Sequence, residues 1–133
     1  MSRLDRTNSV HHVYRCFDAT GRLIYVGSTA NLFGRLDQHR KGSWWSPQVA
    51  KVSAKVYRDG PTARTEERRI IRNENPRWNV QGRWAQLRFA GSLEDLVDYR
   101  FAFTALGNEN TGYGQRHLAA IDQTIAFRER RTA

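Results

Sequence analysis

Two runs of alternating apolar and polar residues form the first clear pattern along the chain. Residues 12–17 (HVYRCF) and 22–26 (RLIYV) are rich in β-branched and aromatic side chains, and the segment 18–21 (DATG) between them contains a glycine. Two such runs around a short glycine-containing turn are typical of a β-hairpin. We therefore predict that the chain begins its sheet with an antiparallel pair of strands.

The register of this hairpin decides how two tyrosines lie. If Phe17 pairs with Arg22, Tyr14 lies directly opposite Tyr25. Both phenols then project from the same face of the sheet. A slip of one residue in the pairing would break this arrangement.

Helical spacing follows the hairpin. Thr29 is expected to cap a helix over residues 30–41. Arg35 and His39 are four residues apart, so they share one face of that helix. Residues 42–47, which include two adjacent tryptophans, are expected to form a loop.

A further strand and helix come next. Residues 52–57 alternate like a half-buried strand. The turn at 59–62 starts a second helix, which is expected to run to about Asn73 and to end before Pro76.

Glu67 is the most unusual residue of this second helix. It lies three or four positions from Ala63, Ile70 and Ile71, so it shares their apolar face, whereas Glu66 points toward the flank. A carboxylate on the buried side of a helix is unfavourable unless a cation or a metal compensates its charge. The pattern therefore marks Glu67 as a candidate for chemistry.

The segment after Gln81 carries weaker signals. Ser92 is expected to cap a short amphipathic helix, and residues 101–103 (FAF) suggest a strand. The spacing of Leu118, Ile121 and Ile125 predicts a last helix of roughly residues 115–130.

These elements together predict an α+β fold with a mostly helical C-terminal extension. Residues 1–80 are expected to form the core domain. Residues 81–133 are expected to form the extension, which packs on the core or mediates dimerisation, so a homodimer is a possible state.

Charge changes this picture more than overall composition does. The chain of 133 residues has 22 Lys and Arg against 13 Asp and Glu, a net charge of +9. Residues 1–80 hold 15 basic and 7 acidic side chains, whereas residues 81–133 hold 7 and 6. A basic surface concentrated in one half of a chain attracts phosphate backbones, although it also serves solubility alone.

Composition also excludes several classes of protein. The chain contains one cysteine, Cys16, which excludes an internal disulfide and a zinc–thiolate cluster and favours a reducing compartment. No apolar run approaches the roughly 18 residues that a membrane span needs. We therefore expect a soluble cytoplasmic protein with no membrane partner.

The first 80 residues place several reactive groups in one predicted domain. Two facing tyrosines, Tyr14 and Tyr25, accompany the Arg35–His39 pair and the inward Glu67. These groups suit phosphodiester hydrolysis: a carboxylate for a divalent cation, a guanidinium for the phosphate, and a phenol or imidazole for proton transfer.

The order of these residues resembles the GIY-YIG nuclease family. The segment VYRCFDATGRLIYVGSTANLFGRL is similar to the start of the catalytic domain in the family's excision-repair members, and YVGST with NLFGRLDQH is similar to small stand-alone members. In the family, a glutamate precedes the proline of a P-x-x-N block by nine residues. Counting back from Pro76 gives Glu67. The resemblance covers about residues 11–80, and it implies a small three-stranded antiparallel sheet flanked by helices, which is consistent with the elements predicted above.

The resemblance implies a DNA endonuclease and a role for each matching residue. Glu67 would bind one Mg²⁺ or Mn²⁺, and Arg35 would hold the scissile phosphate. Tyr14 and Tyr25 would position or deprotonate the attacking water, with the choice of base left open, and His39 would assist proton transfer or contact the phosphate. Two supporting residues are implied as well, Gly27 of the YVG block and Asn79.

Two departures from the family pattern accompany these matches. His12 stands where the first glycine of the motif is usual, and Ser28 stands where excision-repair members have lysine. Neither departure touches Tyr25, Arg35 or Glu67. An active enzyme is therefore expected, and the alternative is a catalytically degenerate nucleic-acid-binding module on the same scaffold.

Further DNA contacts are expected beside the site. Trp44 follows two basic residues in a mixture that suits base stacking, although one tryptophan in the core and one at the surface fits the sequence equally well. The arginines on the second helix suit either a solvated face or phosphate contacts. The candidate set is Arg40, Lys41, Trp44, Arg68 and Arg72.

Overall fold

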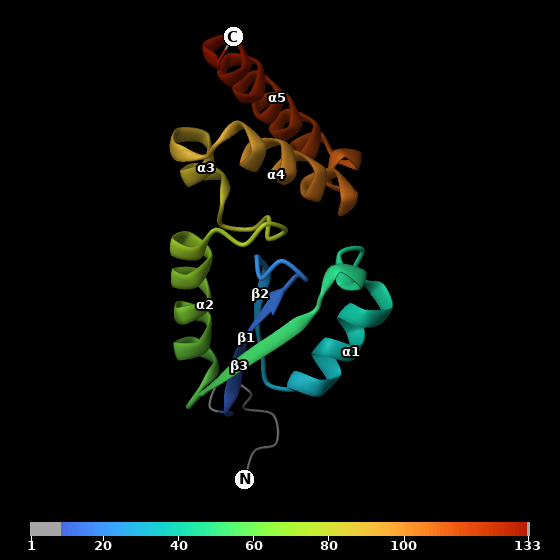
Figure 1. Cartoon of the computed structure of the whole chain (residues 1–133), viewed down its shortest axis with the longest axis vertical. Coiled ribbons are helices and arrows are strands. Elements are labelled where there is room, and N and C mark those ends of the chain that lie inside the picture. The colour runs from blue at the N-terminus through green and yellow to red at the C-terminus, as the bar shows by residue number, and fades with distance from the viewer. Residues whose placement is uncertain (1–8, 133) are drawn as a thin grey trace. The chain divides into compact units, whose positions relative to one another are not determined.

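The computed structural model describes residues 9–132, for Thr132 the backbone only. The chain divides into two compact units, one that ends at Pro76 and one that begins at Arg77. Figure 1 shows the elements of both. Each unit is described by itself below.

The first unit is built on a three-stranded antiparallel sheet, as predicted. Its strands are β1 (His11–Phe17), β2 (Leu23–Thr29) and β3 (Lys51–Tyr57). The spatial order is β2-β1-β3, so β1 is the central strand and pairs with both neighbours.

The register of the hairpin differs from the prediction by two residues. Tyr14 pairs with Gly27 rather than with Tyr25, and Tyr25 pairs with Cys16. An irregularity between Cys16 and Phe17 shifts the register near the turn. Because side chains alternate with a period of two, a two-residue shift keeps both phenols on one face.

Two helices accompany the sheet, α1 (Leu32–Gly42) and α2 (Gly60–Glu74). The cap of α1 is Asn31, not the predicted Thr29: the Asn31 side chain accepts a hydrogen bond from the amide of Gly34. The Thr29 hydroxyl instead accepts from the amide of Asn31 and shapes the turn before the helix. In α2, Asp59 caps the first turn through the amide of Thr62.

The core of the first unit lies between α2 and one face of the sheet. Val13 and Val26 pack there against three buried residues of α2, which are Ala63, Ile70 and Ile71. Side chains alternate across a strand, so Tyr14 and Tyr25 lie on the other face. The helix α1 approaches that second face, and the two helices flank the sheet in Figure 1.

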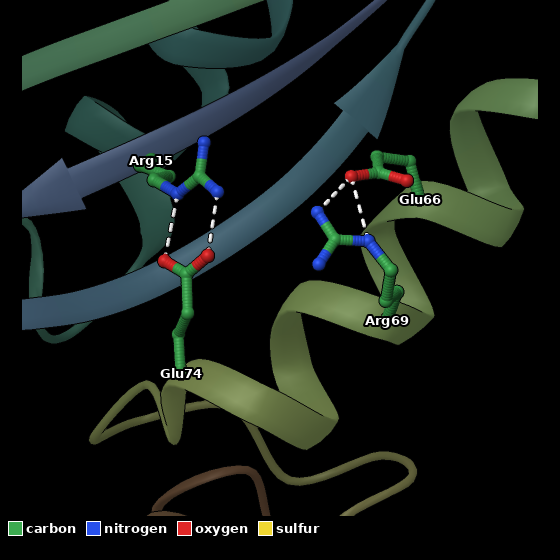
Figure 2. Close-up of polar contacts among 4 residues, drawn as sticks. All are labelled: Arg15, Glu66, Arg69 and Glu74. Carbon is green, nitrogen blue, oxygen red and sulfur yellow. Dashed lines mark hydrogen bonds and ion pairs between the residues drawn. The ribbon is translucent and has the colours of Figure 1, made fainter.

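Two ion pairs border the helix α2 (Figure 2). The guanidinium of Arg15 on β1 donates to both carboxylate oxygens of Glu74, at 2.9 and 2.7 Å. Within the helix, Arg69 donates to Glu66. The first contact joins the C-terminal end of α2 to the central strand, and the second is local to the helix surface.

The second unit is helical. It consists of α3 (Trp84–Ala90), α4 (Leu93–Ala105) and α5 (Gly112–Thr132), with a short 3₁₀ turn η2 (Asn108–Asn110) before α5. The first unit contains a similar 3₁₀ turn, η1 (Ser46–Gln48), after α1.

In the second unit, the predicted cap at Ser92 is confirmed and the predicted strand at residues 101–103 is wrong. Ser92 caps α4 through the amide of Asp95, as expected. Residues 101–103 belong to α4 and do not form a strand, because Phe103 and Tyr99 turn one helical face toward the core. That core also contains Leu87, Leu96 and Ile121.

Among residues 9–132, no helix combines the length and the apolar character that a membrane crossing requires.

Candidate active site

Tyr14 and His39 form the centre of the candidate site. Tyr14 is buried on β1, and its hydroxyl lies 2.7 Å from Nε2 of His39 on α1. The other ring nitrogen, Nδ1, lies 2.7 Å from the hydroxyl of Ser43, the residue that ends α1. Both ring nitrogens of His39 have hydrogen-bond partners when the Tyr14 O–H donates to Nε2 and the Nδ1–H of His39 donates to the Ser43 hydroxyl.

Burial sets the protonation of this pair. It lowers the pKa of His39 to about 4, with the nearby charge of Arg35 as the second cause. Burial also raises the pKa of the Tyr14 phenol well above its ordinary value. Near neutral pH, His39 is therefore an uncharged imidazole that can accept a proton, and Tyr14 carries its own proton.

Tyr25 and Trp45 enclose the same imidazole. The Tyr25 ring centroid lies 6.3 Å from that of Tyr14 and 5.0 Å from that of His39. Trp45 stacks on Tyr25 at 4.4 Å and lies 4.7 Å from His39. Trp45 is buried, so the second tryptophan of the loop, not the first, joins the cluster.

Arg35 brings a positive charge to both phenols. It lies one turn before His39 on α1, the relationship that their spacing predicts. Burial raises the pKa of Tyr14 and of Tyr25, and the Arg35 guanidinium opposes that shift in each. A cation so placed favours negative charge on any group that enters the site.

Glu67 lies half-buried on the α2 side of the sheet. The hydroxyl of Ser28 on β2 donates a hydrogen bond of 2.6 Å to Oε1 of Glu67. Its negative charge contributes to the raised pKa of Tyr25, after the larger effect of burial. The neighbouring Glu66 bonds to Arg69 instead, as Figure 2 shows, so the two adjacent carboxylates have different surroundings.

Glu67 is the side chain of this site that suits a divalent metal ion. Within the described residues, no cluster of three or more His, Cys, Asp or Glu side chains is arranged to hold a metal ion. A lone carboxylate still fits Mg²⁺, which proteins commonly bind through one or two carboxylates, with substrate phosphate and water completing its shell. Glu67 is such a carboxylate, and Ser28 orients it.

His12, at the position of the motif glycine, is on the same face of β1 as Tyr14. It pairs with Thr29 on one side and Val56 on the other. Its Nδ1 is buried and has no hydrogen-bond partner within residues 9–132.

Most of the expected DNA contacts lie outside this cluster. Arg40 and Lys41 are exposed at the end of α1, where both pair with Asp37. Arg68 and Arg72 are exposed on α2. Trp44 is half-buried in the loop after α1.

The two supporting residues differ in their placement. Gly27 is the direct pairing partner of Tyr14. Asn79 is buried in the second compact unit, where its carbonyl oxygen accepts a hydrogen bond of 2.8 Å from Arg83. Of the predicted site residues, the first unit brings Tyr14, Tyr25, Arg35 and His39 together. Glu67 lies on the other face of β2, where it bonds to Ser28.

Sequence reasoning missed three contributors, Ser43, Trp45 and the role of Ser28. Ser43 and Trp45 belong to the loop after α1, where no periodicity marks a side chain as buried or paired. Ser28 contacts a residue 39 positions away. Only the place of Ser28 at a motif position could have signalled it.

Comparisons with known proteins identify a family for the first part of the chain. The family model described as the GIY-YIG catalytic domain matches residues 10–81, which is more than half of the chain. UvrABC system protein C of Pseudomonas fluorescens (strain SBW25) is 28% identical over 103 residues, covering 72% of this chain and 15% of that protein. The chain thus matches only a small part of this relative. No solved structure matches the chain. On the strength of the match over residues 10–81, the chain belongs to the GIY-YIG catalytic domain family.

Proposed function

We propose that this protein is a divalent-metal-dependent endonuclease that hydrolyses DNA phosphodiester bonds. Membership of the GIY-YIG family supports a nuclease-type function in general. The observation that carries the specific proposal is the hydrogen bond of 2.7 Å between Tyr14 and a neutral, buried His39, beside the charge of Arg35. This arrangement supplies a proton acceptor next to a phosphate-binding cation.

Tyr14 and His39 would act as one proton-accepting unit. As water attacks phosphorus, its proton passes to the Tyr14 oxygen while the Tyr14 proton moves along the existing hydrogen bond to Nε2 of His39. The new bond joins the water oxygen to phosphorus. The bond to the leaving sugar oxygen breaks with its electron pair on that oxygen, which takes a proton from solvent water. The imidazolium that forms keeps its second hydrogen bond to Ser43, which holds the ring in place throughout.

Arg35 would bind the scissile phosphate. Its guanidinium suits the paired oxygens of a phosphate, because the two groups match in geometry and carry opposite charge. Arg35 lowers the pKa of both Tyr14 and Tyr25, against the larger effect of burial. This supports a positive charge close to the proton-transfer groups. Charge that develops on the phosphate would be stabilised there without rearrangement of the side chain.

Glu67 would hold the metal ion, and Ser28 would orient it through the bond to Oε1. A bound Mg²⁺ or Mn²⁺ supplies charge neutralisation for the phosphate oxygens and the leaving group. Tyr25 would position the water, because its ring packs against both His39 and Trp45 and is fixed by them.

DNA is the proposed substrate because of the charge distribution. Residues 1–76, the unit that holds the cluster, have 14 Lys and Arg against 7 Asp and Glu, a net charge of +7. Neutralising the phosphate backbone supplies most of the affinity of nonspecific DNA binding and makes it depend on salt.

Nicking of a supercoiled plasmid tests the proposal. The full chain should nick the plasmid with Mg²⁺ and stop when EDTA removes the ion. Glu67→Gln should lower the rate by several orders of magnitude while DNA binding in Ca²⁺ persists, because it removes the charge that the metal needs. Glu66→Gln is the matched control and should cut within a few-fold of the wild type. Binding without any Mg²⁺-dependent nicking would instead identify a DNA-binding module on this scaffold.

A further inference from the structure

The second unit contains a cavity that the proposed nuclease chemistry does not use. Its volume is about 450 Å³, and its walls come from residues 80–82, Trp84, α4, the connection that contains η2 and the start of α5. Cavities of this size are typical of small-molecule and cofactor sites. All the lining residues belong to the unit that begins at Arg77.

Aromatic rings form most of the wall. Trp84 and Tyr99 stack on each other at 5.6 Å. His117 meets Trp84 edge-on at 5.1 Å and lies nearly parallel to Tyr113, at 6.1 Å and 11°. Tyr113 is 70% exposed, so its ring stands at the rim of the cavity. Trp84 and Tyr99 already cover each other's faces, so the exposed ring of Tyr113 is the one that offers a flat face to a planar guest.

The polar groups of the cavity are neutral. None of the described side chains that line it belongs to Asp, Glu, Lys or Arg. The Tyr99 hydroxyl and Nε2 of His117 lie 3.0 Å apart. That contact leaves Nδ1 of His117 and the amide of the exposed Gln81 as donors and acceptors toward a guest. Burial lowers the pKa of His117, which keeps its ring uncharged near neutral pH.

We infer that this cavity binds a nucleobase. Aromatic faces stack on the flat faces of a base, and neutral donors and acceptors match its polar edge. The absence of a lining carboxylate disfavours an ammonium guest, which aromatic cages usually pair with negative charge. This inference concerns binding only and goes beyond the proposed cleavage.

The test uses the full chain in EDTA, so no cleavage contributes to the signal. Two probes separate the sources of a base. One is 2′-deoxyadenosine, followed by NMR line shifts, which has no phosphate for the basic surface to attract. The other is a single-stranded oligonucleotide with one 2-aminopurine, whose fluorescence falls on stacking. Saturable nucleoside binding assigns the cavity to a free base or nucleoside, and quenching in the oligonucleotide assigns it to a base in a strand. Either result supports the inference.

Variants on α5 locate the binding. Tyr113→Ala should weaken binding at least about fivefold, because it removes one stacking face, whereas Tyr113→Phe keeps the ring and should leave binding unchanged. Phe127→Ala is the matched control: Phe127 is 48% exposed on the same helix and does not line this cavity.

Three outcomes would overturn the inference. The first is no measurable binding of the nucleoside together with no quenching in the oligonucleotide. The second is the same affinity for an abasic oligonucleotide as for one with a base. The third is an equal loss of binding in Phe127→Ala and Tyr113→Ala. Each leaves the plasmid-nicking result unaffected, so the cavity and the proposed nuclease are judged separately.

Discussion

Gly27 and Tyr14 face each other across the β1–β2 pair, and the glycine leaves the space that the phenol occupies. A Cβ atom at Gly27 would lie 2.3 Å from the Tyr14 hydroxyl oxygen and 2.5 Å from Cζ. Moving the Tyr14 side chain aside would be energetically unfavourable, because it is buried and its hydroxyl forms a hydrogen bond with His39. The glycine of the YVG block is therefore explained by the ring that lies over it.

Gly27→Ala should consequently damage both stability and activity. We expect the free energy of unfolding to fall by roughly 1–3 kcal/mol, the usual cost of forcing an added methyl into a packed interior. The nicking rate should fall more than tenfold, because the displaced phenol loses its bond to His39. Urea unfolding and plasmid nicking measure the two effects.

Gly42→Ala is the control for that change. A Cβ at Gly42, at the end of α1, would meet no atom of the described residues within 4 Å. This variant should keep the stability and the nicking rate of the wild type. If Gly27→Ala behaved in the same way, the close contact with Tyr14 would not matter to the site.

The hairpin shows what sequence patterns predict and what they do not. Alternation correctly put Tyr14 and Tyr25 on one face, because that depends only on odd and even positions. The pairing itself was wrong by two residues: Phe17 pairs with Leu23 rather than with Arg22, and the irregularity between Cys16 and Phe17 adds the second residue, which no local pattern reveals. The face survived the error because a shift of two preserves it.

The helices show the same division. The i, i+4 relationship of Arg35 and His39 and the apolar face beside Glu67 follow from helical geometry alone, and the structure contains both. The segment 101–103 was wrongly predicted as a strand: two aromatic residues two positions apart share a face only in a strand, whereas in α4 Phe103 is buried and Phe101 is exposed. The stacking of Trp45 on Tyr25 joins a loop to a strand, and tertiary packing alone determines it.

His39 predicts a loss of stability in acid. Its pKa is 6.5 in an unfolded chain and about 4 in the fold, so the unfolded state binds the proton more readily. The contribution of this group is therefore fully present above pH 6.5 and declines as pH falls toward 4. At pH 4.5 the free energy of unfolding should have lost about 2–3 kcal/mol of the His39 contribution.

His39→Gln isolates this effect from the carboxylates that also titrate in acid. Urea unfolding of the wild type and the variant at pH 7.5 and 4.5 gives the comparison. The stability advantage of the wild type over His39→Gln should shrink by about 2–3 kcal/mol at the lower pH. An advantage that is the same at both pH values would show that His39 is not held neutral by the fold.

Ile121 tests the interior of the second unit. It is fully buried in the core of its own chain, so it is not a residue of a dimer interface. Ile121→Ala should lower the free energy of unfolding by about 2–5 kcal/mol through the cavity it leaves. The mass by light scattering should stay that of the wild type. Phe127→Ala, at an exposed position of the same helix, should cost far less, and equal costs would contradict the assigned core.

Ser28 should control the affinity for the metal ion more than the maximal rate of cleavage. Its hydroxyl donates the hydrogen bond of 2.6 Å that orients the Glu67 carboxylate. Groups that orient a metal ligand typically contribute 10- to 100-fold to metal affinity. Ser28→Ala leaves the carboxylate and its charge in place, so the site should still fill when Mg²⁺ is abundant. The Mg²⁺ concentration for half-maximal nicking should rise about 10-fold or more, with most of the rate recovered at saturation.

Ser53→Ala is the matched control, since Ser53 lies on β3 and pairs with Arg15, away from Glu67. It should leave the Mg²⁺ dependence of the wild type unchanged. A Ser28→Ala variant with the wild-type Mg²⁺ dependence would show that Glu67 needs no orientation by Ser28. A variant whose nicking is lost at every Mg²⁺ concentration, while its unfolding stability is retained, would mean that the hydroxyl takes part in cleavage itself. A titration of nicking rate against Mg²⁺ on the three proteins distinguishes these cases, because only an orienting role moves the midpoint and spares the plateau.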